Sequence, residues 1–293
     1  MHGWIILDKP LGLGSTQGVS AVKRALREGG YPKAKVGHGG TLDPLATGVL
    51  PIAVGEATKL AGRMLDSDKV YDFTLSFGVE TDTLDAEGGE IARSDVRPSC
   101  AEIEAVLPRF TGPIEQVPPA YSALKIDGER AYDLARAGEE VVLASRSVTI
   151  HSLTIAAVNA DSVTLTAHVS KGTYIRSLAR DLAHALGTVG HVTMLRRTRA
   201  GPFTLEQAIS LDKLGEAAKG RTLEDILLPL RAGLDDIPAL SLTPDQAGLL
   251  RQGRVLAGIA ADDGQHFALL GDIPVALVEV HAGEVRVVRG FNL

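Results

Sequence analysis

The chain of 293 residues has a single cysteine, Cys100. One thiol can form neither an intrachain disulfide nor a cysteine-based zinc site, so we expect a protein of the reducing cytoplasm. No apolar run reaches the roughly eighteen residues that a membrane helix needs. Residues 1–9 also lack the basic segment and long apolar stretch of a signal peptide. These absences argue against a secreted disulfide framework and against a helical membrane protein.

The sequence also lacks a nucleotide-binding P-loop and any run of residues at metal-ligand spacing. Both absences argue against a nucleotide or metal cofactor. Hydrophobic residues make up 45% of the chain and charged residues 23%, which is an ordinary globular composition that permits a sizeable core. The length suggests one large domain, or a large domain with a small one.

The formal net charge of -6 argues against a nucleic-acid partner, but the charges are unevenly distributed. Residues 21–42 carry five basic groups and one acidic group, a net of +4, and residues 171–200 carry six and one, a net of +5. Residues 201–245 carry four basic and eight acidic groups, a net of -4. Each basic stretch alone is typical of a solvated face. We hypothesise that the two converge on one groove suited to a phosphate backbone.

The most informative stretch runs from Gly37 to Pro51. Its glycines permit a backbone course, and a close approach by another molecule, that a Cβ would block. Pro44 keeps Asp43 out of a helix and stiffens the chain behind its carboxylate. The apolar run 49–54 then predicts a buried strand. An Asp beside Gly and Pro commonly makes only a turn, but the whole pattern indicates a carboxylate presented on a rigid scaffold.

Hydrophobic periodicity predicts helices over 15–27 and 173–186, a strand over 70–77, and a hairpin of 147–156 with 162–169. Asp127-Gly128 is a predicted turn. Together these elements favour an α+β fold with a mixed, mostly antiparallel central sheet and flanking helices.

Residues 201–236 are acidic and predicted to be helical, and 235–238 has the composition of a boundary. Beyond it, a helix over 243–253 and short strands at 267–270, 275–280 and 285–289 predict a small β-rich unit, a barrel or half-barrel. We therefore expect a larger domain at 1–235 and a smaller one at 236–293.

The stretch around Asp43 closely resembles the active-site motif of the TruB-type tRNA pseudouridine synthases, G-H-T-G-x-L-D-P-x-A-x-G-x-L, whose Asp is catalytic. The chain departs from that pattern at Gly39, where the family usually has Thr. Four further stretches match family motifs in the same order, at residues 7–15, 65–71, 119–125 and 170–178. Five ordered matches across most of the chain make chance agreement improbable.

The resemblance implies a pseudouridine synthase fold followed by a PUA-like RNA-binding domain. It also implies a cytoplasmic enzyme that isomerises uridine to pseudouridine in the T-loop of tRNA, at position 55. The target base would be flipped out of the folded RNA before it reacts. The T-arm stem-loop of tRNA is then the partner, with no cofactor, metal, membrane or obligatory protein partner.

By the same resemblance, the catalytic residues are Asp43, Tyr71, which stacks on the flipped uracil, and Arg176, whose charge favours an ionised carboxylate. Asp43 could be a nucleophile at the sugar or the base, or could remove a sugar proton, and these alternatives stay open. For Arg176 and Tyr71 the plainer alternatives are a surface arginine and a half-buried strand aromatic. Six further residues are expected to bind substrate: His38, Lys9, Tyr174, Leu195, Lys171 and Arg196.

Two of these six have alternatives that the sequence leaves open. Lys9 could support the pocket, hold a phosphate, or be a plain exposed lysine. His38 could stack or hydrogen-bond where the base leaves the RNA, or be a satisfied loop histidine.

Two other functions compete with the stand-alone enzyme. One is an RNA-binding or tRNA-folding module without catalysis, against which the intact Asp43, Tyr71 and Arg176 argue. A tRNA-chaperone role could also coexist with catalysis. The other is a guide-RNA-dependent synthase of the dyskerin type, which shares these motifs but needs partner proteins and usually carries a larger tail domain. The short C-terminal segment favours the stand-alone enzyme.

Overall fold

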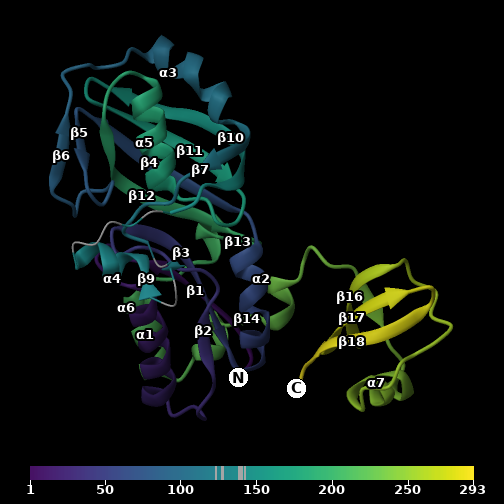
Figure 1. The fold of residues 1–293 in the computed structure, drawn as a ribbon. Helices are drawn as coiled ribbons and strands as arrows, with labels where there is room; N and C mark the ends of the chain where they lie inside the picture. The colour runs from purple at the N-terminus through teal and green to yellow at the C-terminus, as the bar shows by residue number, and fades with distance from the viewer. Residues whose placement is uncertain (123, 127–128, 138–140, 142) are drawn as a thin grey trace.

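The computed structural model describes residues 1–122, 124–126, 129–137, 141 and 143–293. The fold is α+β, as predicted, with one large sheet and a smaller C-terminal sheet (Figure 1). In spatial order the large sheet consists of β14 (Leu228–Pro229), β1 (Gly3–Lys9), β3 (Ala46–Val54), β12 (Gly190–Ala200), β4 (Lys69–Phe77), β11 (Ser162–Val169), β10 (Arg146–Asn159) and β7 (Gly112–Gln116). Two short strands extend it, β2 (Val36–His38) beside β3 and β13 (Phe203–Thr204) beside β12.

The sheet has one parallel joint along this order, where residues 195–197 of β12 pair with residues 46–48 of β3. The neighbouring strands pair antiparallel on both sides of it. The sheet is therefore mixed and mostly antiparallel, as predicted. The joint connects an N-terminal half, with β1 and β3, to a half with β4, β10 and β11 (Figure 1).

Each half is covered by its own helices (Figure 1). In the N-terminal half, α1 (Ser15–Glu28) and α6 (Leu211–Gly220) share a core with β1 and β3. In the other half, α3 (Cys100–Val106) and α5 (Ile175–Ala185) pack on β4, β10 and β11. The buried side chains Val19, Val22 and Leu26 lie three and four residues apart, which puts them on one face of α1.

The C-terminal sheet has the order β15 (Ala239–Ser241), β16 (Gly264–Leu270), β17 (Ile273–His281) and β18 (Glu284–Gly290). Helix α7 (Pro244–Arg251) covers its own small core. The predicted β-rich segment is thus confirmed. The two sheets are docked, because Phe267, Leu277 and Phe291 share a hydrophobic cluster with Trp4 and Phe203.

The remaining elements are short. They are α2 (Ala61–Asp66), β5 (Val79–Thr81), β6 (Glu90–Arg93), β8 (Lys125–Ile126), β9 (Glu129–Arg130), α4 (Ala131–Arg136) and the 3-10 helices at Gly55–Leu60, Leu107–Phe110, Leu205–Gln207, Leu223–Ile226 and Leu230–Gly233. The predicted turn at 127–128 lies outside the described residues. Within the part of the chain that is described, no helix is both long and apolar enough to cross a membrane.

One strand was missed from the sequence, and one expectation was wrong. Strand β12 was not predicted, because register shifts at 192–194 and 197–199 break the alternation of side chains that marks a strand. Residues 201–236 are not uniformly helical. Only α6 is an α-helix there, and Pro202, Gly220 and Pro229 limit the rest to 3-10 turns and two-residue strands.

The substitution Gly48→Ala should destabilise the protein. Gly48 has a φ of +101°, and an added Cβ would meet the carbonyl oxygen of Arg197 at 2.1 Å across the parallel joint. We expect a loss of more than about 2 kcal/mol in the free energy of unfolding, measured in urea. Gly37→Ala is the control, because its Cβ would have no neighbour within 4 Å. Equal stability of the two variants would contradict the tight joint.

Candidate active site

Asp43 lies in the loop between β2 and β3, and the main chain on both sides of it is fixed. The Ala46 amide donates to the Asp43 carbonyl oxygen at 3.0 Å, which closes a turn around Pro44. The Ser15 hydroxyl accepts from the Leu42 amide at 2.8 Å and donates to the Leu42 carbonyl at 3.0 Å. The start of α1 therefore holds the residue directly before the carboxylate.

Lys9 supports the same loop from behind. Its side chain is fully buried, and its Nζ donates to the carbonyl oxygens of Leu13 at 2.6 Å, Pro10 at 3.2 Å and Pro44 at 3.3 Å. Burial, partly offset by the nearby Asp43 carboxylate, lowers the pKa of Lys9 to about 8. The alternative of a plain exposed lysine is wrong.

Arg197 holds the glycine segment of the loop. It is almost fully buried in β12, and its guanidinium donates to the carbonyl oxygens of Val49 at 2.8 Å, Gly40 at 3.2 Å and Thr41 at 3.3 Å. The sequence marked Arg197 only as one charge of a basic stretch. Its position opposite Gly48 in the parallel joint is what makes it a loop support.

The carboxylate of Asp43 is paired with Arg176, whose Nη2 lies 2.9 Å from Oδ2. The Arg176 side chain is only 7% exposed, whereas that of Asp43 is 41% exposed. Two main-chain groups fix the orientation of the guanidinium, because it also donates to the carbonyl oxygens of Thr83 at 3.0 Å and Tyr121 at 3.1 Å. The alternative of an exposed surface arginine is wrong.

The pair lines a cavity of about 660 Å³. Four other side chains named from the sequence line the same cavity: His38, Tyr71, Tyr174 and Leu195. They come from β2, β4, the N-cap of α5 and β12, so the cavity lies where the two halves of the sheet meet. The structure thus brings together residues that are far apart in the chain.

His38 is partly buried in this cavity. Burial and the positive charge of Arg197 lower the pKa of His38, which favours the neutral imidazole. Among the described residues, its Nδ1 has no hydrogen-bond partner. The alternative of a satisfied loop histidine is therefore not what the structure shows.

Three of the expected substrate-binding residues lie outside the cavity lining. Lys9 is behind the loop. Lys171 is exposed and pairs with Asp66 at 2.9 Å. Arg196 makes two bonds to the Asp8 carboxylate, at 2.9 and 3.0 Å.

Asp85 is a site residue that the sequence did not single out. It is buried in the cavity wall, with Oδ2 at 3.5 Å from Nη1 of Arg176. Its Oδ1 accepts from the Thr83 hydroxyl at 2.5 Å and the Glu87 amide at 3.0 Å. In the sequence, Asp85 is one of three acidic residues within 81–89. The spacing of these residues does not indicate that the segment packs on α5.

The structure explains why residue 39 is glycine, although the family motif usually has threonine at this position. A Cβ at this position would lie 2.6 Å from the Cβ of Met64, which is buried in α2. The space that a threonine side chain needs is thus occupied by a methionine, and the loop keeps its course without the hydroxyl.

The fold and this cavity define the class of protein. The structure is similar to that of an H/ACA RNP bound to a substrate RNA containing 2'-deoxyuridine, with a TM-score of 0.76 and 24% identity. The similarity covers 99% of this chain and 85% of that chain. At this identity it shows the fold alone, which is the pseudouridine synthase fold.

Sequence comparison gives the particular family. The model of the TruB family pseudouridylate synthase N-terminal domain matches residues 27–175, and that of the tRNA pseudouridylate synthase B C-terminal domain matches residues 176–235. The tRNA pseudouridine synthase B of Novosphingobium aromaticivorans is 68% identical over the whole of this chain and 98% of its own length. That of Zymomonas mobilis is 63% identical, over the whole of this chain and 96% of its own length. The chain belongs to the TruB family.

The position of Lys9 leads to a prediction that separates support from substrate binding. Lys9→Met removes three partly buried hydrogen bonds to carbonyl oxygens, so we expect a loss of stability of about 1–3 kcal/mol and slower turnover. The affinity for tRNA and its salt dependence should stay unchanged. Lys213→Met, at an exposed position of α6, is the control for loss of one charge. If Lys9 held a phosphate, the salt slope would fall by about one unit.

Proposed function

We propose that this protein isomerises uridine to pseudouridine at position 55, in the T-loop of tRNA, with Asp43 as the catalytic residue. The observation that carries the proposal is the Asp43–Arg176 pair of 2.9 Å in the wall of the cavity. Asp43 is the exposed partner of the pair and can reach a ligand in the cavity, whereas Arg176 is held from behind. The family and the named relatives support the same activity.

In the reaction, the C1′–N1 bond of uridine breaks, the uracil rotates, and C5 bonds to C1′. The proton on C5 is lost and one is gained at N1, so atoms balance without an oxidant or a second substrate. Asp43 can act as nucleophile at the sugar or the base, or as the base that removes a sugar proton. In each role, the ion pair with Arg176 holds the carboxylate in position.

The base must leave the folded RNA to reach Asp43, at a free-energy cost of a few kcal/mol. Tyr71 lies in the cavity wall and offers an aromatic face on which a uracil can stack. Leu42 and Leu195 are apolar parts of the same wall. They limit the access of water to a base that has been detached from its sugar.

The basic residues near α1 offer a surface for the RNA backbone. Lys23, Arg27, Lys33 and Lys35 line a groove of about 800 Å³ between α1 and β2. No basic residue of 171–199 lines this groove. Much of the charge there is used within the protein: Lys171, Arg176, Arg180 and Arg196 pair with carboxylates. We therefore propose the groove at α1 as the main surface for the RNA backbone.

We assign catalysis to residues 1–235 and RNA binding to a PUA-like unit at 236–293, in a cytoplasmic enzyme that acts without a guide RNA or protein partner. The second family model ends at residue 235, next to the start of the C-terminal sheet. The relatives that align over the whole chain are named as tRNA enzymes. The similar H/ACA structure makes the guide-dependent alternative worth testing directly.

The direct test uses purified protein and an unmodified tRNA transcript, with no other component. We expect pseudouridine at position 55 for the wild type, and for Asp43→Asn tRNA binding without turnover. Asp95→Asn, which removes an exposed carboxylate far along the chain, is the control and should stay active. Inactive wild type that recovers with a guide RNA would support the dyskerin-type alternative. Turnover by Asp43→Asn, after deamidation is excluded, would remove Asp43 from its role.

Salt dependence tests the groove at α1. Affinity for tRNA should fall as salt rises, because phosphate contacts release counterions. Replacing Lys23 and Arg27 by Gln should lower the slope of log affinity against log salt by about one unit for each phosphate that is no longer neutralised. Lys213→Gln and Lys219→Gln on α6 serve as the matched control. An unchanged slope in the first variant would remove α1 from the RNA footprint.

A further inference from the structure

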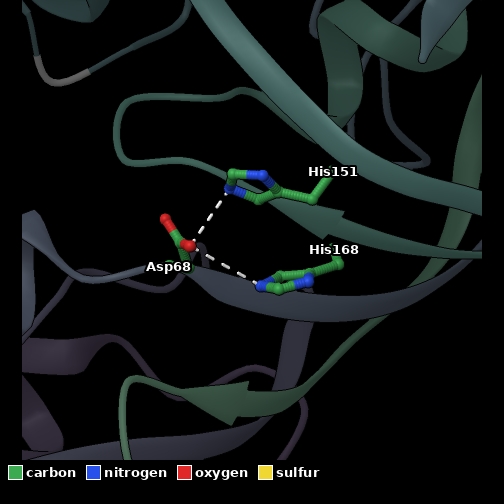
Figure 2. A group of neighbouring side chains, drawn as sticks. All are labelled: Asp68, His151 and His168. Atoms are coloured by element: carbon green, nitrogen blue, oxygen red, sulfur yellow. Dashed lines mark ion pairs between the residues drawn. The ribbon is translucent and has the colours of Figure 1, made fainter. Parts of the chain in front are cut away.

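A cluster of metal-ligand type lies outside the cavity, at Asp68, His151 and His168. Figure 2 shows both imidazole rings turned toward the Asp68 carboxylate. The Nε2 atoms of His151 and His168 lie 3.0 and 3.7 Å from the same carboxylate oxygen. One ligand atom from each of the three residues lies within 4.8 Å of the others. None of the three lines the active-site cavity.

The backbone of the sheet brings the three groups close together. His151 is the extra residue at a register shift between Ile150 and Ser152 of β10, and Ser152 pairs with His168 of β11. Such a bulge turns a side chain that regular alternation would send to the other face. Asp68 directly precedes β4, and its carbonyl oxygen accepts from the Gly201 amide at 2.9 Å. The three groups therefore come from a part of the sheet whose main chain is held by hydrogen bonds.

The hydrogen bonding of the cluster is incomplete. The Nε2 of His168 is shielded from solvent and has no hydrogen-bond partner among the described residues. Its distance of 3.7 Å to Asp68 is too long for a hydrogen bond. A buried imidazole nitrogen without a partner is costly unless something else occupies its lone pair. His151 and Asp68, by contrast, are about two-fifths exposed, so an ion can enter from solvent.

Two imidazole nitrogens and one carboxylate oxygen are a ligand set suited to Zn²⁺, with water at a fourth position. Zinc bonds of about 2.0–2.2 Å in a tetrahedron place ligand atoms a little over 3 Å apart. The two nitrogen–oxygen distances of 3.0 and 3.7 Å lie on either side of that value. Small side-chain rotations bring all three atoms onto one ion.

We propose that Asp68, His151 and His168 bind a divalent transition ion of the Zn²⁺ type. The ion links the start of β4 to β10 and β11, two strands that follow it only after a long intervening segment. The ion lies outside the active-site cavity and would stabilise the strands that form its wall. Tyr71, which lines the cavity, lies on the same strand β4 and pairs with Ala167, next to His168. The site needs no substrate and is independent of the proposed function.

The test uses full-length protein without a histidine tag, freed of metal by a chelator. Titration with Co²⁺ should produce the visible absorption band of a tetrahedral cobalt site with about one equivalent bound, and Zn²⁺ should displace it. Saturating Zn²⁺ should raise the Tm by about 5 °C, since the ion binds only the folded chain. His151→Gln and His168→Gln should each weaken binding by about tenfold or more, because one of three ligands is removed.

His281→Gln is the matched control. His281 also pairs with a carboxylate, that of Asp263 at 3.1 Å, but among the described residues this pair is not part of a three-residue group that could hold a metal ion. His2→Gln controls for chelation by His2 and the adjacent amino terminus. Neither should change the cobalt band. Circular dichroism of the metal-free variants checks that they are folded, and His151 is exposed enough for its variant to fold. Absence of the band in wild type, or a band that survives both cluster variants, would overturn the proposal.

Discussion

The buried guanidinium of Arg197 connects the two halves of the sheet to the loop that presents Asp43. Burying a charge is costly unless its donors are satisfied, and here three carbonyl oxygens of residues 40, 41 and 49 accept from it. The same residue pairs with Gly48 in the parallel joint, where only glycine leaves room for its carbonyl. The loop course, the joint and the burial of Arg197 therefore depend on each other.

Around this joint the candidate active site is assembled from both halves. Asp43 comes from the N-terminal half, held by Lys9 and Ser15, whereas Arg176 comes from the helix that covers the other half. The motifs of the family divide in the same way. The motif at 7–15 supports the loop, and that at 170–178 supplies the guanidinium. Residues of the first motif, such as Lys9 and Ser15, thus have a positional role in holding the loop.

The sequence predicted those elements whose pattern is contained within a short segment of the chain, and it missed those that depend on tertiary packing. Helix α1, strand β4, the hairpin of β10 and β11, and the glycine loop have periodic or turn-forming sequences, and all were predicted. Strand β12 was missed because two register shifts hide its alternation. Asp85 was missed because its role depends on the packing of an acidic loop against α5, which no spacing reveals.

The same limit applies to charge. The basic stretch at 171–200 predicted a surface for RNA, yet Arg197 is buried and Arg196 is paired with Asp8. A count of charges along the chain does not distinguish a guanidinium that faces solvent from one that satisfies carbonyl oxygens. The stretch at 21–42 differs because its side chains lie on an exposed helix and loop, where periodicity does indicate the outer face.

The parallel joint also constrains the order in which the enzyme can become active during its synthesis. Strand β3 leaves the ribosome early, but its partner β12 and the helix bearing Arg176 are made more than a hundred residues later. Contacts between distant segments form only after the intervening chain is available. A nascent chain that ends before α5 holds the Asp43 loop without Arg176 or Arg197. The Asp43–Arg176 pair and the Arg197 support of the loop can therefore form only late in translation, once α5 and β12 have been made.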